Sequence, residues 1–138
     1  MQYNIFTNRL PTVSEWQSLR KNAGWHFYND IDSQTALDNS LFGVCVYDND
    51  NMLIGMARVV GDGKSCFYIQ DVVVHSDWRS QGIGKIVMTE VLKYIDANAA
   101  ERAVVALMSA KGREKFYESF GFIKRPTDNL GHGMVRFL

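Results

Sequence analysis

The sequence predicts an α/β fold in which a mixed, mostly antiparallel sheet of about seven strands is flanked by about four helices. Two observations predict it. Extended apolar runs in the middle of the chain are separated only by short turns, which is typical of an antiparallel meander. A helical period and then a continuous apolar run follow them, which is typical of a strand–helix–strand crossover. No repeat, linker or low-complexity tract interrupts the chain, so we expect one domain over residues 1–138.

The first part of the chain predicts one strand and two helices. A short apolar run at residues 3–6 is the candidate strand. Thr12 followed by Glu15 is a capping-box pattern, and Gly24 is a helix stop, so we expect the first helix between them. Its apolar face consists of Trp16, Leu19 and Ala23. The second, shorter helix is expected to begin at Asp32 or Ser33 and to end near Asn39.

The middle of the chain predicts three strands joined by tight turns. The runs at residues 41–47, 52–60 and 66–75 are rich in β-branched and aromatic residues. Polar residues at 48–51 form the first turn, and Asp62-Gly63 forms the second, a hairpin turn. Strands joined by turns of this length pair antiparallel.

The last part of the chain predicts a crossover helix and closing strands. Helical spacing returns at residues 82–98, and a strand covered on both faces is expected at 103–108. A short helix is expected at 111–120, ended by a glycine, and two closing strands at 122–124 and 134–138. The apolar face of the long helix consists of Ile83, Val87, Val91 and Ile95.

The composition limits the classes of partner. Fifteen basic and fifteen acidic side chains give no net charge, so we expect neither nucleic acid nor an anionic membrane surface as a partner. No apolar run approaches the roughly 20 residues of a membrane span, and the first ten residues contain no long apolar core, so we expect a cytoplasmic protein. Cys45 and Cys66 lie in apolar stretches and are expected to be buried, reduced thiols.

The turn before the long helix is the most informative segment. An apolar strand runs into a helix whose first turn contains Gly82 and Gly84, with Arg79 and Lys85 on either side. Helix starts expose free N–H donors that bind phosphates, and glycine lets a pyrophosphate approach the backbone. A tight turn or close packing of the helix on the sheet is the alternative. A dinucleotide-binding turn is disfavoured because Val87 stands where its third glycine would be.

Two motifs in this sequence resemble those of the GNAT superfamily of N-acetyltransferases. Arg79-Ser80-Gln81-Gly82-Ile83-Gly84 is similar to the acyl-CoA signature of that family, Arg/Gln-x-x-Gly-x-Gly/Ala. Phe116-Tyr117-Glu118-Ser119-Phe120-Gly121-Phe122 resembles its Phe-Tyr-x-x-x-Gly-Phe segment. The order of predicted elements also fits the family along nearly the whole chain.

The resemblance implies that acetyl-CoA is the cosubstrate and that no metal takes part. Backbone amides of the signature would bind the pyrophosphate, and the pantetheine arm would lie along the fourth strand. Ser109 stands near a position where many relatives have an asparagine that touches the pantetheine. The chain also departs from the family pattern at Ser76 and Ser80, without loss of a backbone donor. The residues expected to bind the cosubstrate are Val72, Val73, Val74, Arg79, Ser80, Gln81, Gly82, Ile83, Gly84, Lys85 and Ser109.

The resemblance also suggests the catalytic residues. An alkylamine has a pKa of about 10.4 and arrives protonated, so a base or a water relay must remove its proton. Tyr117 matches the family tyrosine that protonates the leaving thiolate; the alternative is an aromatic residue that fills the core. Asp71 is the candidate base or water-positioning residue, or else it accepts structural hydrogen bonds. Other relatives have a carboxylate at the position of Gln70, and strand alternation is expected to turn these two side chains to opposite faces.

The loop between the first two helices forms the wall of the acceptor site in this family. Here its candidate contacts are Trp25, His26, Tyr28 and Asp30; the alternative is a packed loop whose aromatic rings cover the sheet. We therefore expect transfer of an acetyl group to a primary amine of a small molecule. The alternatives are acetylation of a protein lysine or N-terminus, and a non-catalytic sensor of acyl-CoA. Relatives often form dimers, so a homodimer is expected.

Overall fold

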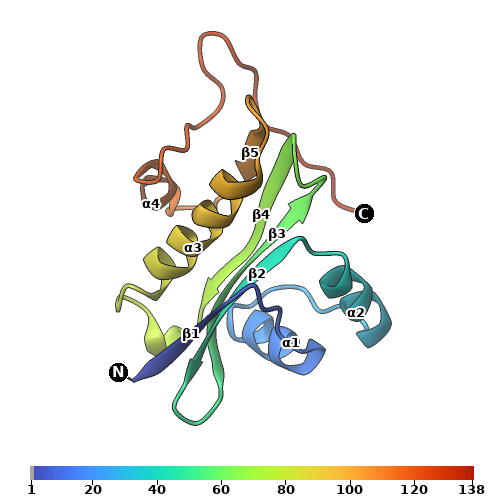
Figure 1. Ribbon diagram of the computed structural model, residues 1–138, viewed down its shortest axis with the longest axis vertical. Coiled ribbons are helices and arrows are strands. Elements are labelled where there is room, and N and C mark those ends of the chain that lie inside the picture. The colour runs from blue at the N-terminus through green and yellow to red at the C-terminus, as the bar shows by residue number, and fades with distance from the viewer. Residues whose placement is uncertain (1) are drawn as a thin grey trace. The chain divides into compact units, whose positions relative to one another are not determined.

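The computed structural model describes residues 2–138 (Figure 1). Its internal contacts divide the chain into two compact units, Met1–Leu107 and Met108–Leu138. The first unit contains the whole sheet and three of the α-helices, and the second contains one short α-helix. A single domain over residues 1–138 stays a prediction.

A mixed five-stranded sheet forms the centre of the first unit. Its strands are β1 (Tyr3–Thr7), β2 (Phe42–Asp48), β3 (Leu53–Gly61), β4 (Cys66–Val74) and β5 (Val104–Leu107). They lie in the order β1-β2-β3-β4-β5. All neighbours pair antiparallel except β4 and β5, which pair parallel. The predicted meander and crossover are therefore confirmed.

Helices cover both faces of this sheet (Figure 1). Helix α3 (Ile83–Asn98) packs on β2, β3 and β4 from one face, and α1 (Val13–Asn22) packs on β3 and β4 from the other, beside α2 (Asp30–Asp38). The predicted capping box of Thr12 is formed at the start of α1. Among residues 2–138, no helix combines the length and the apolar character that crossing a membrane requires.

Helix α2 begins earlier than the sequence predicted. Its N-cap is Asn29, whose side-chain oxygen accepts a hydrogen bond from the backbone N–H of Asp32 at 2.8 Å. Ser33 cannot act as the cap because its hydroxyl is buried and accepts a hydrogen bond from Gln17 Nε2 at 2.7 Å. Asp30, which was expected in the loop, is consequently the first residue of the helix.

The two faces of the sheet have separate apolar cores. On the α3 face, the ring of Phe42 stacks on Tyr94 with centroids 4.3 Å apart. Gly55 of β3 lies so close to the start of α3 that an added Cβ would be 2.7 Å from Ile83 Cγ2. The buried residues of α3 are Ile83, Val87, Met88, Val91 and Ile95. The core of the opposite face consists of Trp16, Leu19, Leu37, Cys45, Tyr47, Leu53, Met56 and Val73.

The expectation for the cysteines was half wrong. Cys45 is buried, and burial raises the pKa of its thiol to about 12. Cys66 is exposed because it is the first residue of β4 and lies beside the β3–β4 turn.

The second unit lacks the two closing strands that the sequence predicted. It contains one helix, α4 (Glu114–Glu118), and within residues 108–138 neither 122–124 nor 134–138 forms a strand. Residues between them instead form a turn, in which the N–H of Thr127 donates to the carbonyl of Leu130 at 2.8 Å. Short apolar runs have strand propensity, but a strand forms only where a neighbour supplies ladder hydrogen bonds. The sheet therefore has five strands where about seven were expected.

Replacing Gly55 by alanine tests the close approach of α3 to β3. We expect Gly55→Ala to lower the free energy of unfolding by about 1–3 kcal/mol, because the new methyl group collides with the buried Ile83. Urea denaturation followed by circular dichroism measures the loss. Gly131→Ala is the control, since a Cβ at Gly131 meets nothing within 4 Å. Equal stability of the Gly55 variant and the wild type would contradict this packing.

Candidate active site

A turn with left-handed backbone joins β4 to α3. It passes through a short 3-10 helix, Ser76–Trp78, and then through Ser80 at φ +62° and Gly82 at φ +83°. Gly82 is the N-cap of α3, and because glycine has no side chain it makes no side-chain capping hydrogen bond. A Cβ built on Gly82 meets no protein atom within 4 Å. The backbone at the start of α3 is therefore open to a ligand.

This turn presents a row of backbone donors. The first hydrogen bond of the helix runs from the N–H of Ile86 to the carbonyl of Gly82 at 3.1 Å. Within residues 2–138, the amides of 79–85 donate to no protein acceptor. Arg79 and Lys85 are exposed and add positive charge to that of the helix dipole. Free amides, open space and positive charge are the features that a phosphate site requires. Binding of a pyrophosphate at this turn stays a prediction.

Strand β4 offers a second feature beside this turn. Its parallel ladder with β5 ends at the pair of Ile69 and Leu107, whereas β4 continues to Val74. In the described part of the chain, no other strand pairs with this edge of β4. Val72 and Val74 are half-buried there, and the side chain of Val73 packs in the core beneath α1. Backbone groups of this segment are therefore available on its free edge.

A β-bulge interrupts β4 at Asp71. The register with β3 shifts by one residue there, so that Asp71 and Val72 together face Ala57. Asp71 has φ +59°, in the left-handed region that non-glycine residues seldom adopt. Gln70 pairs with Arg58, whose side chain bonds to Asp71, so Gln70 and Asp71 lie on the same face. The expectation that they face opposite ways was wrong, because regular alternation fails at a bulge.

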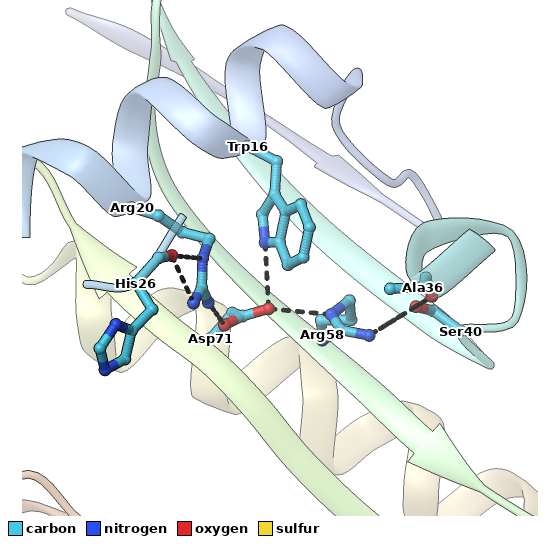
Figure 2. Close-up of polar contacts among 7 residues, drawn as sticks. All are labelled: Trp16, Arg20, His26, Ala36, Ser40, Arg58 and Asp71. Carbon is cyan, nitrogen blue, oxygen red and sulfur yellow. Dashed lines mark hydrogen bonds and ion pairs between the residues drawn. The ribbon is translucent and has the colours of Figure 1, made fainter. Parts of the chain in front are cut away.

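The carboxylate of Asp71 is the centre of a buried polar cluster (Figure 2). Its Oδ1 accepts from Arg20 Nη1 at 2.6 Å. Its Oδ2 accepts from Arg58 Nε at 2.9 Å and from Trp16 Nε1 at 3.0 Å. The side chain of Asp71 is 1% exposed. Both oxygens are engaged and hidden from solvent, so these contacts favour the structural role over the role of a base.

Sequence reasoning missed the partners of Asp71. Arg20 and Trp16 are four residues apart and lie on the buried side of α1, and Arg58 lies within an otherwise apolar strand. A buried charge must be paired. An arginine on the apolar side of a helix or inside an apolar strand was therefore a signal that such a cluster exists.

Three of the four predicted acceptor residues, Trp25, His26 and Tyr28, lie in the loop between α1 and α2, and the fourth is the first residue of α2. Trp25 and Tyr28 are 38% and 47% exposed, and the ring of Tyr28 stacks on Trp16 with centroids 6.0 Å apart. His26 is exposed, and Asp30 is exposed at the start of α2. A groove between α1 and α2 includes Asp30 but not the other three residues. It is lined by Val13, Ser14, Gln17, Phe27, Asp30 and Gln34.

Two predicted site residues belong to the second unit. Tyr117 lies in α4, where its ring meets that of Phe116 at 5.0 Å and that of Phe122 at 6.4 Å. Burial raises the pKa of the Tyr117 hydroxyl above its usual value, and the charge of Arg113 opposes this shift. Ser109 donates its hydroxyl proton to the carbonyl of Ala110 at 2.8 Å.

Comparison with known proteins gives consistent matches. Residues 10–122 match the sequence profile of the Acetyltransferase (GNAT) family. An uncharacterized ycf52-like N-acetyltransferase from Prochlorococcus marinus is 33% identical over 93% of this chain and 73% of its own length. A crystal structure of a probable acetyltransferase of unknown function from meticillin-resistant Staphylococcus aureus is 33% identical, with a TM-score of 0.87 over 99% of both chains. Arabidopsis thaliana Naa50, solved with the bisubstrate analogue CoA-Ac-MVNAL, shares the fold at 22% identity, with a TM-score of 0.72 over 91% of this chain and 86% of its own.

Removing the charge of Asp71 tests the structural role of the cluster. We expect Asp71→Asn to lower the free energy of unfolding by about 3–5 kcal/mol, because two guanidinium groups would remain buried without a counter-charge. Urea denaturation measures this loss. Asp96→Asn is the matched control, since Asp96 is exposed on α3. A loss for Asp71→Asn no larger than that of the control would contradict the structural role.

Proposed function

This chain belongs to the GNAT acetyltransferase family and is an N-acetyltransferase; we propose that it moves the acetyl group of acetyl-CoA to the primary amine of a small molecule. The observation that supports this proposal most strongly is the turn before α3. It combines free backbone amides, an open glycine and two basic side chains at the position of the family signature. Coenzyme A contains the pyrophosphate that such a turn suits.

The residues of the turn and of β4 would share the binding of the cosubstrate. Amides of 81–85 would donate to the pyrophosphate, and Arg79 and Lys85 would add charge. The free edge of β4 beyond Ile69 would pair with the amide groups of the pantetheine arm, as an added strand would. Bound in this way, acetyl-CoA supplies the activated acetyl group as its thioester.

The bulge would serve the addition step. Attack by the amine places negative charge on the thioester oxygen, and a fixed backbone donor stabilises such an oxyanion. Asp71 and Val72 face one residue of β3, so one of their backbone units has no ladder partner. The side chain of Asp71 would hold this backbone in place through its bonds to Arg20 and Arg58. Because its oxygens are engaged, we assign the proton of the amine to a water relay.

Tyr117 would act as the general acid. The departing thiolate of coenzyme A needs a proton, and a phenol hydroxyl can donate one. Burial raises the pKa of Tyr117, so this hydroxyl stays protonated throughout the neutral range. Its proton is lost only when the pH rises through a pKa above the usual value of about 10.

The loop between α1 and α2 would bind the acceptor. Its exposed rings of Trp25 and Tyr28 offer surface to an apolar part of the amine, and the exposed carboxylate of Asp30 offers attraction to a cation. A compact aromatic loop suits a small molecule. Acetylation of a protein amine is the alternative, and a panel that contains both amines and peptides distinguishes the two.

Replacing Tyr117 by phenylalanine tests the general acid. We expect turnover in Tyr117→Phe to fall by about 10²-fold or more, because the leaving thiolate loses its proton donor. Release of coenzyme A thiol from acetyl-CoA is followed with a panel of small amines and peptides, and calorimetry checks that acetyl-CoA binding is retained. Tyr3→Phe, on the edge strand β1, is the control. Undiminished turnover in Tyr117→Phe would contradict the assignment, and wild-type binding without turnover would support the sensor.

Replacing Gly82 by alanine tests the phosphate site. We expect Gly82→Ala to weaken acetyl-CoA binding by about tenfold, because a methyl group would stand over the free amides and the backbone at φ +83° disfavours it. Calorimetry measures the affinity. Gly63→Ala is the matched control, since Gly63 has φ +82° in the hairpin between β3 and β4. Equal losses of affinity in both variants would contradict a site at Gly82.

A further inference from the structure

The loop of residues 24–29, here called the acceptor loop, is held only in part by packing of its own aromatic side chains. Trp25 is 38% exposed, Tyr28 is 47% exposed and Phe27 is 73% exposed. The ring of Tyr28 stacks on Trp16, and the carbon of the Arg20 guanidinium lies 5.4 Å from the centroid of the Trp25 ring and 5.2 Å from that of the Tyr28 ring. Since none of the three rings is fully buried, the loop needs a further anchor.

That anchor is a pair of buried polar side chains on α1. Arg20 donates from Nε and Nη2 to the carbonyl of His26 at 3.3 and 3.1 Å, and Gln17 donates from Nε2 to the carbonyl of Tyr28. Gln17 and Arg20 are three residues apart, so they lie on one side of the helix. They are only 8% and 6% exposed. The loop is thus tied to α1 through alternate main-chain carbonyls.

The same guanidinium of Arg20 reaches the bulge of β4. Its Nη1 donates to Asp71 Oδ1 at 2.6 Å, while its other nitrogens bond to the carbonyl of His26 (Figure 2). The guanidinium is planar, with donors in a fixed fork. It therefore sets the position of the loop carbonyl relative to the bulge. In the proposed function, these two segments bring the amine and the thioester together.

Arg58 provides a comparison within the same cluster. It also bonds to Asp71, from Nε to Oδ2 at 2.9 Å, and it is 8% exposed. Its remaining donor Nη1 reaches the Ser40 hydroxyl at 3.1 Å and the carbonyl of Ala36 at 3.4 Å. These acceptors lie at the end of α2 and just after it. Within residues 2–138, Arg58 therefore shares the carboxylate but donates no hydrogen bond to the acceptor loop.

We propose that Arg20 is a positioning residue that fixes the acceptor loop against the β4 bulge, so that it controls acceptor binding without touching the acceptor. This inference rests on the proposed function, because it assigns the loop to the amine. Gln17 assists by holding the carbonyl of Tyr28. Arg58 stabilises the cluster through its bond to Asp71 but does not position the acceptor loop.

Matched methionine variants test the proposal. Both Arg20→Met and Arg58→Met leave Asp71 with one guanidinium and the indole of Trp16, so the two variants lose comparable parts of the cluster. Chymotrypsin cleavage at the exposed aromatic residues of the loop, located by mass spectrometry, reports how often the loop opens. We expect cleavage about tenfold faster in Arg20→Met, with cleavage in Arg58→Met within about twofold of wild type.

Kinetics then separate positioning from stability. The acceptor is whichever amine of the panel gives the highest wild-type turnover. We expect its KM to rise about tenfold in Arg20→Met, with the KM for acetyl-CoA within about twofold of wild type. In Arg58→Met we expect both KM values within about twofold of wild type, and any loss to fall on kcat, because Arg58 helps Asp71 to hold the bulge. Arg20→Lys keeps the charge beside Asp71 but not the fork, so it should restore stability and not the KM.

Three results would overturn the proposal. Equal effects of Arg20→Met and Arg58→Met on cleavage and on the amine KM would reduce Arg20 to a structural role. An unchanged amine KM in Arg20→Met, with normal wild-type turnover, would overturn the positioning role and leave the proposed function intact. Absence of wild-type turnover with every amine and peptide would overturn both, whatever the cleavage rates show.

Discussion

The buried carboxylate of Asp71 is the interaction on which the geometry of the first unit depends. It joins β4 to β3 through Arg58 and to α1 through Arg20 and Trp16. One anion between two cations leaves an excess positive charge, which main-chain carbonyls and aromatic rings partly offset. The carbon of the Arg20 guanidinium lies 4.9 Å from the centroid of the Trp16 ring. A buried ion pair adds little stability compared with well-packed apolar residues, so the contribution of this cluster is a defined geometry.

That geometry follows from the bulge. An extra residue in β4 would leave a flexible irregularity, but the carboxylate of Asp71 accepts hydrogen bonds from three side chains, and these fix the bulge. At the bulge, the side chains of β4 switch from one face of the sheet to the other. Phe67 contacts Tyr94 of α3, whereas Asp71, four residues later, bonds to α1. In a regular strand both would face the same way. The free edge of β4 and the open start of α3 lie directly beyond this point in the chain.

The sequence predicted what local patterns determine. The meander, the crossover helix and the capping box at Thr12 depend on neighbours within a few residues, and all three are present. The bulge depends on a carboxylate whose partners lie 51 and 55 residues away, so periodicity could not reveal it. The cap at Asn29 was missed because Asp32 and Ser33 are equally good caps by residue type. The prediction of two closing strands was wrong because an apolar run does not specify the strand with which it would pair.

The sequence correctly indicated that Asp71 is unusual, because it is an acidic residue among apolar ones. Its role depends on which groups donate hydrogen bonds to its carboxylate. Three donors hide both oxygens of Asp71, so its charge orders the protein around it, and the proton of an acceptor amine needs another route. The anchoring of the acceptor loop follows the same logic. Arg20 and Gln17 donate to the main-chain carbonyls of residues 26 and 28. Every residue type has this carbonyl, so these two hydrogen bonds do not depend on the side chains at those positions. The ring of Tyr28 also stacks on Trp16, whereas the side chain of His26 is exposed, so a change at position 26 can alter the acceptor preference without disturbing the cluster.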